Sequence, residues 1–373
     1  MKKTLVALAV LAASGAAMAQ VSITGNFSFG HVTTVQGKAD ATKATVTSSG
    51  FGVQTSEVFF NVKEDLGGGM GLSLKYGLAG LDRSGESLPG QASTGAPNST
   101  NGSAGAYGAF GTNGLVTGRN ASVTLTTPVG AITYGTVKIA DYLNAQAGLG
   151  MNIDDLSDLR GNILLVGRQR RDFLQYDLPV GAFTLSAAHL ESGNDLGIAD
   201  GAQGPNADQV SAALGRSVAQ RINVLGAGYS ANGLVLNGQY LAYDNNWGPA
   251  NFGGDGNVDY VWRAGGNYNF GMAKVGAAIQ VINYVRSRKN TQTMLTVAVP
   301  LGAIDLGASY ALQSVTDSPL AGVNGDRDGY LLYAAYNLSK RTAMKFQYAD
   351  FKTSIAAGQE NSNSTYLIMS HNF

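Results

Sequence analysis

The sequence lacks several features that proteins of this size commonly use. It contains no cysteine, so no disulfide can hold it together, and only 13% of its 373 residues are charged. That share is about half of the roughly 25% usual in soluble domains. After the signal-like first twenty residues, no apolar run approaches the ~18 residues that a membrane-spanning helix requires. The composition therefore argues against both an ordinary soluble enzyme and a helical membrane bundle.

Charge of one sign is also missing. The chain carries 25 basic and 25 acidic side chains, so its net charge gives no indication of a nucleic-acid partner. What is abundant is glycine, with 51 residues, nearly double the usual share of about 7%. Hydrophobic residues reach 44%, with 17 Tyr and 13 Phe, which excludes a disordered chain.

The first 19 residues have the three parts of a cleaved secretory signal. Lys2 and Lys3 form a basic start, an apolar stretch runs from Leu5 to Ala13, and Ala17-Met18-Ala19 supplies the small residues of a cleavage site. A buried helix or a membrane anchor is the alternative, but the apolar run is too short to span a bilayer. We therefore expect a signal peptide over residues 1–19 and a single domain over residues 20–373.

Hydrophobic residues along the mature chain recur with a period of two. In Leu72-Ser73-Leu74-Lys75-Tyr76, apolar side chains alternate with small or charged ones. Between residues 260 and 270, Tyr260 and Trp262 share one face and Arg263 lies on the other. Such alternation places the two sets on opposite faces of a strand, which helical spacing does not do. The chain is predicted to be all-β.

The connections between the predicted strands are of two kinds. Short turns contain Gly, Pro or Asn-Gly, as in Leu178-Pro179-Val180-Gly181 and Ser230-Ala231-Asn232-Gly233, which suits tight hairpins. Long polar segments cover residues 83–116, 138–167 and 192–216. Short turns at one rim and long loops at the other are typical of outer-membrane barrels, whose turns are periplasmic and whose loops are extracellular.

Sixteen strands can be counted, an even number as single-chain bacterial barrels require. Their predicted starts are Val21, Gln54, Gly71, Leu115, Ala131, Arg168, Ala182, Arg221, Leu234, Asn257, Ala273, Thr291, Ala303, Gly329, Thr342 and Asn361. The fold class is therefore a transmembrane, sixteen-stranded antiparallel β-barrel, wide enough to enclose an aqueous lumen. A propeller or solenoid is the alternative, but no repeated signature supports it.

Four segments carry a family resemblance: Phe60–Met70, Gly118–Val123, Tyr176–Pro179 and the ending His371-Asn372-Phe373. With them, the mature chain resembles the trimeric general porins of Gram-negative bacteria, especially those of beta-proteobacteria. The resemblance implies a homotrimer in the outer membrane, without cofactors, that lets ions and small hydrophilic solutes diffuse passively through water. It also implies a third extracellular loop, residues 138–167, folded inward to narrow the pore. Phe373 resembles the terminal signal that the barrel-assembly machinery reads.

Charges at a constriction select permeating solutes by sign and size. The resemblance places acids of the third loop in the pore; the candidates are Asp141, Asp154, Asp155 and Asp158. Solvation or pairing within the loop is the alternative for these acids. Alternation suggests basic residues of the facing wall, namely Lys63, Lys75, Arg119, Lys138 and Arg171. Arg168 and Arg170, on the other face of their strand, are candidates for contact with lipopolysaccharide phosphates.

Other kinds of site find little support. His31, His189 and His371 fall on three separate predicted strands, so no compact metal-binding spacing is expected. No Gly-x-Ser-x-Gly motif is present, and we expect no enzyme activity. A solute-specific uptake channel remains an alternative, as do an adhesin and, less favoured, a barrel enzyme. The sign of any ion selectivity is left open, because both signs of charge are available near the predicted constriction.

Overall fold

The computed structural model describes most of the mature chain. The described residues are 19–37, 44–79, 117–138, 142–147, 170–192, 220–243, 258–285, 287–318, 324–352 and 361–373. Among them, no helix is both long and apolar enough to cross a membrane. The predicted signal peptide, residues 1–19, falls almost entirely outside this part of the chain.

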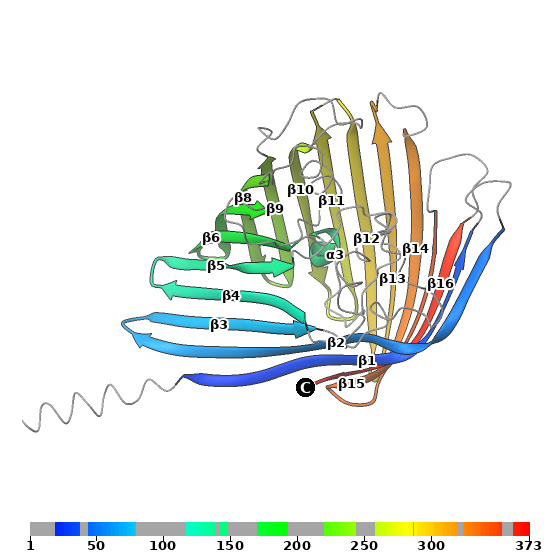
Figure 1. The fold of residues 1–373 in the computed structure, drawn as a ribbon, viewed down its shortest axis with the longest axis horizontal. Coiled ribbons are helices and arrows are strands. Elements are labelled where there is room, and N and C mark those ends of the chain that lie inside the picture. Colours follow the sequence, from blue (N-terminus) through cyan, green and yellow to red (C-terminus); the bar gives the residue numbers. More distant parts are fainter. Residues whose placement is uncertain are drawn as a thin grey trace, which may run out of the picture.

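Sixteen antiparallel strands form a closed barrel in which each strand pairs with its neighbours in sequence and β1 pairs with β16 (Figure 1). The bounds are β1 Gln20–Gln36, β2 Val46–Gly67, β3 Met70–Ala79, β4 Thr117–Thr127, β5 Gly130–Lys138, β6 Arg170–Val180, β7 Phe183–Ser192, β8 Gln220–Ala231, β9 Leu234–Tyr243, β10 Val258–Asn269, β11 Lys274–Tyr284, β12 Lys289–Leu301, β13 Ile304–Thr316, β14 Gly325–Asn337, β15 Thr342–Phe351 and β16 Ser362–Asn372. A short helix, α3 (Tyr142–Ala147), follows β5.

The predicted fold class and strand number are confirmed, and all but two strand starts agree within two residues. β2 begins at Val46 rather than near Gln54, because its polar first part pairs with β1 through backbone hydrogen bonds that leave no hydrophobic signal. β14 begins at Gly325 rather than near Gly329, since the polar, glycine-containing residues Gly325–Asp328 already pair with β13. In both places, pairing with a neighbour overrides local composition.

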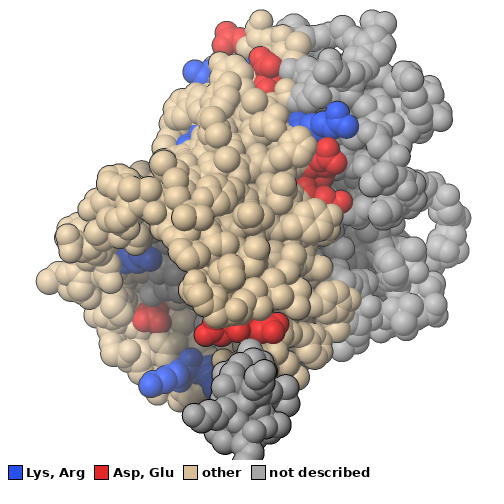
Figure 2. Space-filling view, turned by 90° about the vertical axis from the view of Figure 1, so that its left-hand side faces the viewer, with Lys and Arg blue, Asp and Glu red and all other residues tan. Residues whose placement is uncertain are grey.

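The two faces of the strands meet different surroundings. In β12, Met294 points into the barrel and is 1% exposed, whereas the adjacent Leu295 points outward and is 52% exposed. The outward side chains of later strands are likewise exposed, as Leu332 of β14, Phe346 of β15 and Leu367 of β16 show. Figure 2 shows a broad stretch of surface without Lys, Arg, Asp or Glu, with charged residues gathered toward its edges. This apolar outer wall is the surface that a lipid bilayer covers.

Connections at the two rims differ as predicted. Two-residue turns join β2 to β3, β4 to β5, β6 to β7, β8 to β9 and β12 to β13. Gly181 and Gly302 have φ angles of 62° and 67° in such turns, a conformation that is costly for residues with a Cβ. At the opposite rim the connections are longer, except that only residues 285–288 join β11 to β12. The short-turn rim corresponds to the predicted periplasmic side.

Barrel closure depends on the last residue of the chain. The Gly25 N–H donates to the Phe373 carbonyl at 2.9 Å, and the Phe373 N–H donates to the Gly25 carbonyl at 3.0 Å. A Cβ at Gly25 would lie 2.4 Å from Cζ of Phe373 and 2.5 Å from the Glu57 carbonyl oxygen. The aromatic ring therefore lies directly over a residue that must have no side chain.

We expect Gly25→Ala to weaken this seam by the roughly 1–3 kcal/mol typical of overpacking. The measurement is the temperature at which the folded band on a denaturing gel shifts to the unfolded position. Gly71→Ala is the matched control, because a Cβ there would come no closer than 3.6 Å to the nearest atom. Equal transition temperatures for the two variants would contradict this account of the seam.

Candidate functional site

The helix α3 lies inside the barrel, against the inner faces of β10, β11 and β12 (Figure 1). It belongs to the long segment between β5 and β6, the third loop of the sequence analysis. Only residues 139–141 separate it from the end of β5 at Lys138. This part of the third loop therefore lies within the lumen.

Tyr142 fixes the start of α3 to the wall. Its hydroxyl donates to the Asn237 carbonyl of β9 at 2.9 Å, and the Arg263 guanidinium of β10 lies over its ring at 4.3 Å from the centroid. Burial raises the pKa of Tyr142 to about 12, although the nearby Arg263 charge acts in the opposite direction. The phenol therefore remains a neutral hydrogen-bond donor at physiological pH.

The end of α3 is held by different contacts. The Thr296 hydroxyl of β12 donates to the Ala147 carbonyl. A Cβ on Gly276 of β11 would lie only 2.1 Å from that carbonyl oxygen, so a glycine is needed for the helix to approach. Leu143 is fully buried and belongs to one apolar cluster with Met294. The helix is thus attached at both ends and packed between them.

A continuous row of polar side chains crosses the inner wall beside α3. Its members are paired across six adjacent strands, β9 to β14: Gln239, Arg263, Gln280, Gln292, Gln313 and Arg327. We call these residues the inner polar row. Gln280, Gln292 and Gln313 are at most 2% exposed. Polar groups buried to this extent require hydrogen-bond partners.

Hydrogen bonds connect much of the inner polar row. Arg263 donates from Nε and Nη2 to Oε1 of Gln239 at 2.8 and 2.5 Å. In the same way, Arg327 donates from Nε to Oε1 of Gln313 at 2.8 Å. Gln280 donates to Oε1 of Gln292 at 3.1 Å. The row therefore has an arginine near each end, each fixed by a glutamine of the neighbouring strand.

Two of the predicted basic residues are described with their side chains, and both belong to the inward face of the first strands. Nζ of Lys75 lies 4.5 Å from the centroid of the Phe59 ring, and Lys75 is exposed to the lumen. Lys63 lies near the β2–β3 turn, where it lines a hollow of about 560 Å³ with Asp65 and other residues. Lys75 therefore lies away from the turn, and Lys63 close to the periplasmic rim.

For three other predicted basic residues, the structure describes the position in a strand only. Arg119 lies in β4, Lys138 ends β5 and Arg171 lies in β6, where it pairs with Val137, but the side chains of these three lie outside what the structure describes. Asp141, Asp154, Asp155 and Asp158 all lie outside the described residues. Their placement in the pore remains a prediction.

The residues that hold α3 were not among the predicted site residues. Alternation correctly assigns Arg263, Gly276 and Gln280 to the polar face of their strands, since their outward neighbours such as Trp262 are exposed. It does not indicate which of them meets the loop. That information lies in the register between strands and in the path of the third loop, and neither produces a periodic signal.

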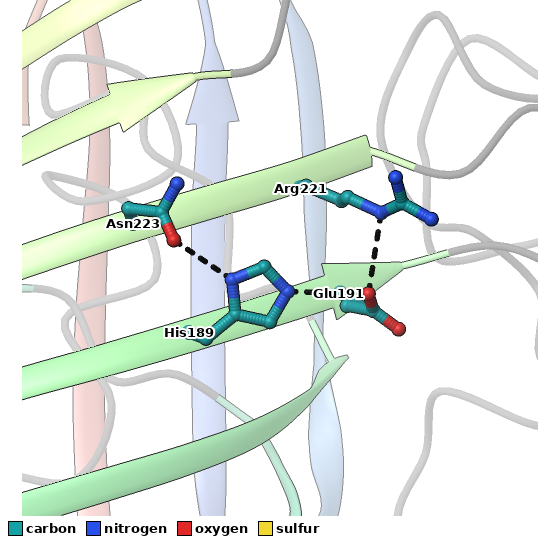
Figure 3. A network of polar contacts seen from close by, with 4 residues as sticks. All are labelled: His189, Glu191, Arg221 and Asn223. Carbon is teal, nitrogen blue, oxygen red and sulfur yellow. Dashed lines mark hydrogen bonds and ion pairs between the residues drawn. The ribbon is translucent and has the colours of Figure 1, made fainter.

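A second polar network lies on the outer wall near the ends of β7 and β8 (Figure 3). His189 contacts Asn223 at 2.8 Å and Glu191 at 3.1 Å, and Nε of Arg221 donates to the same Glu191 oxygen at 3.3 Å. This face continues toward the other rim with exposed Leu185 and Leu225. The network therefore marks the edge of the apolar band.

Metal ligands do not converge in the described part of the chain, where no group of three or more His, Cys, Asp or Glu side chains could hold an ion. The three histidines lie on β1, β7 and β16. His31 contacts the Ser49 hydroxyl at 3.1 Å, and His371 contacts the Thr342 hydroxyl at 2.9 Å.

A wide barrel with an apolar exterior, a polar interior and a loop helix inside it has the architecture of a channel. A model of the Gram-negative porin family matches residues 4–356. The chain belongs to the Gram-negative porin family. The porin accordingly lies in the outer membrane and forms a water-filled channel through it.

Solved structures share this fold at low sequence identity. The anion-selective porin from Comamonas acidovorans is 17% identical with a TM-score of 0.60, over 95% of this chain and 100% of that chain. The channel DcaP of Acinetobacter baumannii is 12% identical with a TM-score of 0.62, over 95% and 97%. OmpT of Vibrio cholerae, solved in a trimer form, is 13% identical with a TM-score of 0.57, over 95% and 99%. No curated protein matches the porin.

We expect Gly276→Ala to push α3 away from the wall and to lower the single-channel conductance. The added Cβ would meet the Ala147 carbonyl, and the resulting strain of about 1–3 kcal/mol is most simply relieved by moving the short helix into the lumen. Recordings from single channels measure the effect. Gly228→Ala is the control, since its Cβ would meet nothing closer than 3.6 Å. An unchanged conductance in Gly276→Ala would contradict this packing.

Proposed function

We propose that the porin is a general diffusion channel, in which the third loop narrows the lumen without providing a specific binding site, and that it has no catalytic activity. The observation that carries the proposal is the position of α3, held against the inner wall of a sixteen-stranded barrel. Exposed Lys75 on β3 adds a charged group to the inner wall. With the acids of the third loop proposed on the opposite side of the pore, both signs of charge would face the permeating ions, which favours weak ion selectivity.

We also propose a homotrimer, as implied by the family resemblance and consistent with the trimer form of Vibrio cholerae OmpT. Residues 1–19 would direct export and be removed, and Phe373 would be read by the barrel-assembly machinery. The outer-wall network of Arg221, Glu191 and His189 lies where headgroups of the outer leaflet would meet the barrel. Lipopolysaccharide phosphates are suitable partners for such an arginine.

Reconstitution of the purified porin into planar bilayers should give stepwise current increases, in groups of three for a trimer. Current should rise linearly with salt concentration and remain unaffected by added sugars, because solutes diffuse without binding. Current that saturates, or that one solute class blocks, would instead support a solute-specific channel. The absence of steps at every voltage would refute the channel itself.

Selectivity should respond in opposite directions to charges on the two sides of the constriction. We expect Asp154→Asn with Asp155→Asn to shift the reversal potential in a salt gradient toward anions, and Lys75→Gln to shift it toward cations. A unit charge about 8 Å from a permeating ion in water contributes roughly 0.5 kcal/mol, which corresponds to about a twofold change in the permeability ratio.

An unchanged reversal potential in the double aspartate variant would exclude a pore-facing role for these acids. The conservative variant Lys75→Arg is the control for Lys75→Gln, because it keeps the charge.

A further inference from the structure

Arg263 of β10 lies over the ring of Tyr142, the first residue of α3. The guanidinium carbon lies 4.3 Å from the ring centroid, and the ring itself is 5% exposed. Guanidinium groups stack on aromatic faces because their planar, weakly hydrated charge meets the negative π surface. The contact therefore joins β10 to the first residue of the helix.

Arg263 is held in the orientation that this stacking requires. Its Nε and Nη2 both donate to Oε1 of Gln239, at 2.8 and 2.5 Å, so the plane of the guanidinium is fixed by two bonds on one edge. A lysine could reach the same place but has no plane to stack and no fork with which to bind Gln239. The geometry thus depends on arginine specifically.

The same residue of α3 is attached to the neighbouring strand as well. The Tyr142 hydroxyl donates to the Asn237 carbonyl of β9, two residues before Gln239. Tyr142 therefore contacts two strands: its hydroxyl binds β9, and its ring contacts Arg263 of β10. A mutation that removes one of these contacts leaves the other in place, so the two contacts can be tested separately.

The loop that α3 belongs to carries charge. Residues 139–169 include Asp141, Asp154, Asp155, Asp158, Arg160 and Arg168. A transmembrane voltage exerts a force on a charge that lies in its field, and within the proposed constriction that force would be transmitted along the chain to α3. A segment under such a force must be attached to the wall if the pore diameter is to stay constant.

We propose that Arg263 is a positioning residue of the channel: by stacking on Tyr142, it holds α3 against the wall and so fixes the aperture under voltage. It acts through this contact, and the role depends on the planar, forked guanidinium and not on its charge alone. The inference rests on the constricting role of the third loop proposed above.

The test is single-channel recording of Arg263→Gln. We expect a severalfold rise in open-channel current noise, additional conductance levels, and closure at lower voltage than in the wild type. The reversal potential in a salt gradient is read from the charge-conserving variant, Arg263→Lys, in which it should stay unchanged. Arg263→Lys keeps the charge and should nevertheless resemble Arg263→Gln, because it cannot stack or fork.

Arg327→Gln provides a matched control. Arg327 belongs to the same inner polar row and donates to Gln313 as Arg263 does to Gln239, but it lies on β14, whereas α3 packs against β10, β11 and β12. Its loss removes a comparable hydrogen bond from the wall and should leave noise and closing voltage at wild-type values. Equal effects of Arg263→Gln and Arg327→Gln on noise and closing voltage would overturn the proposal, as would wild-type noise in Arg263→Lys.

Tyr142→Leu keeps the test decisive if Arg263→Gln does not fold. It should reproduce the noise and early closure, and Tyr142→Phe, which keeps the ring but loses the bond to Asn237, should show a smaller effect. The double variant Arg263→Gln with Tyr142→Leu should be no noisier than Tyr142→Leu alone, which already removes both contacts, and a further increase would overturn the proposal. If the wild-type porin forms no channel, the proposed function is refuted. If Arg263→Gln forms channels with wild-type noise, only this inference is refuted and the proposed function stands.

Discussion

A peptide group in the hydrocarbon core of a membrane has no water to bind, so every backbone N–H and C=O must find its partner within the protein. This requirement determines the architecture of the porin. Sixteen strands satisfy it only because β1 pairs with β16 across the whole length of the sequence. The last link of that pairing, between Gly25 and Phe373, leaves no room for a side chain on Gly25. The shape of the molecule thus depends on a seam formed by its two ends.

Once the barrel is closed, each strand has one face toward lipid and one toward the interior. The low charge of the sequence follows from the first face, since charge there would be costly. The glutamines follow from the second. Gln280, Gln292 and Gln313 would be unsuitable on the outer wall, but inside Gln280 donates to Gln292, and Gln313 donates to Asn290 and accepts from Arg327. Their uncharged amides make a wall that is polar without adding charge.

Much of this arrangement could be predicted from the sequence, because strand alternation is a local property. The pattern around Trp262 and Arg263 is sufficient to assign their faces, and the tight Gly and Pro turns to divide the chain into hairpins. The start of β2 is an exception, since the Ser and Gly residues there pair with β1 without an alternating hydrophobic pattern. The contacts that hold Tyr142 against the wall could not be predicted. It depends on a loop meeting strands that lie about a hundred residues further along the chain, a distance over which no periodicity extends.

The connection between β11 and β12 has a consequence for how the chain finds its fold. From β10 to β15 the strands follow one another through connections of eight residues or fewer at both rims, so their contacts are close in sequence and little chain entropy is lost in forming each pair. The earlier strands must close far longer segments, such as residues 80–116. The surface that receives α3 is therefore built from the part of the sheet whose pairing is least costly. The helix inside the lumen rests on the most locally connected part of the chain.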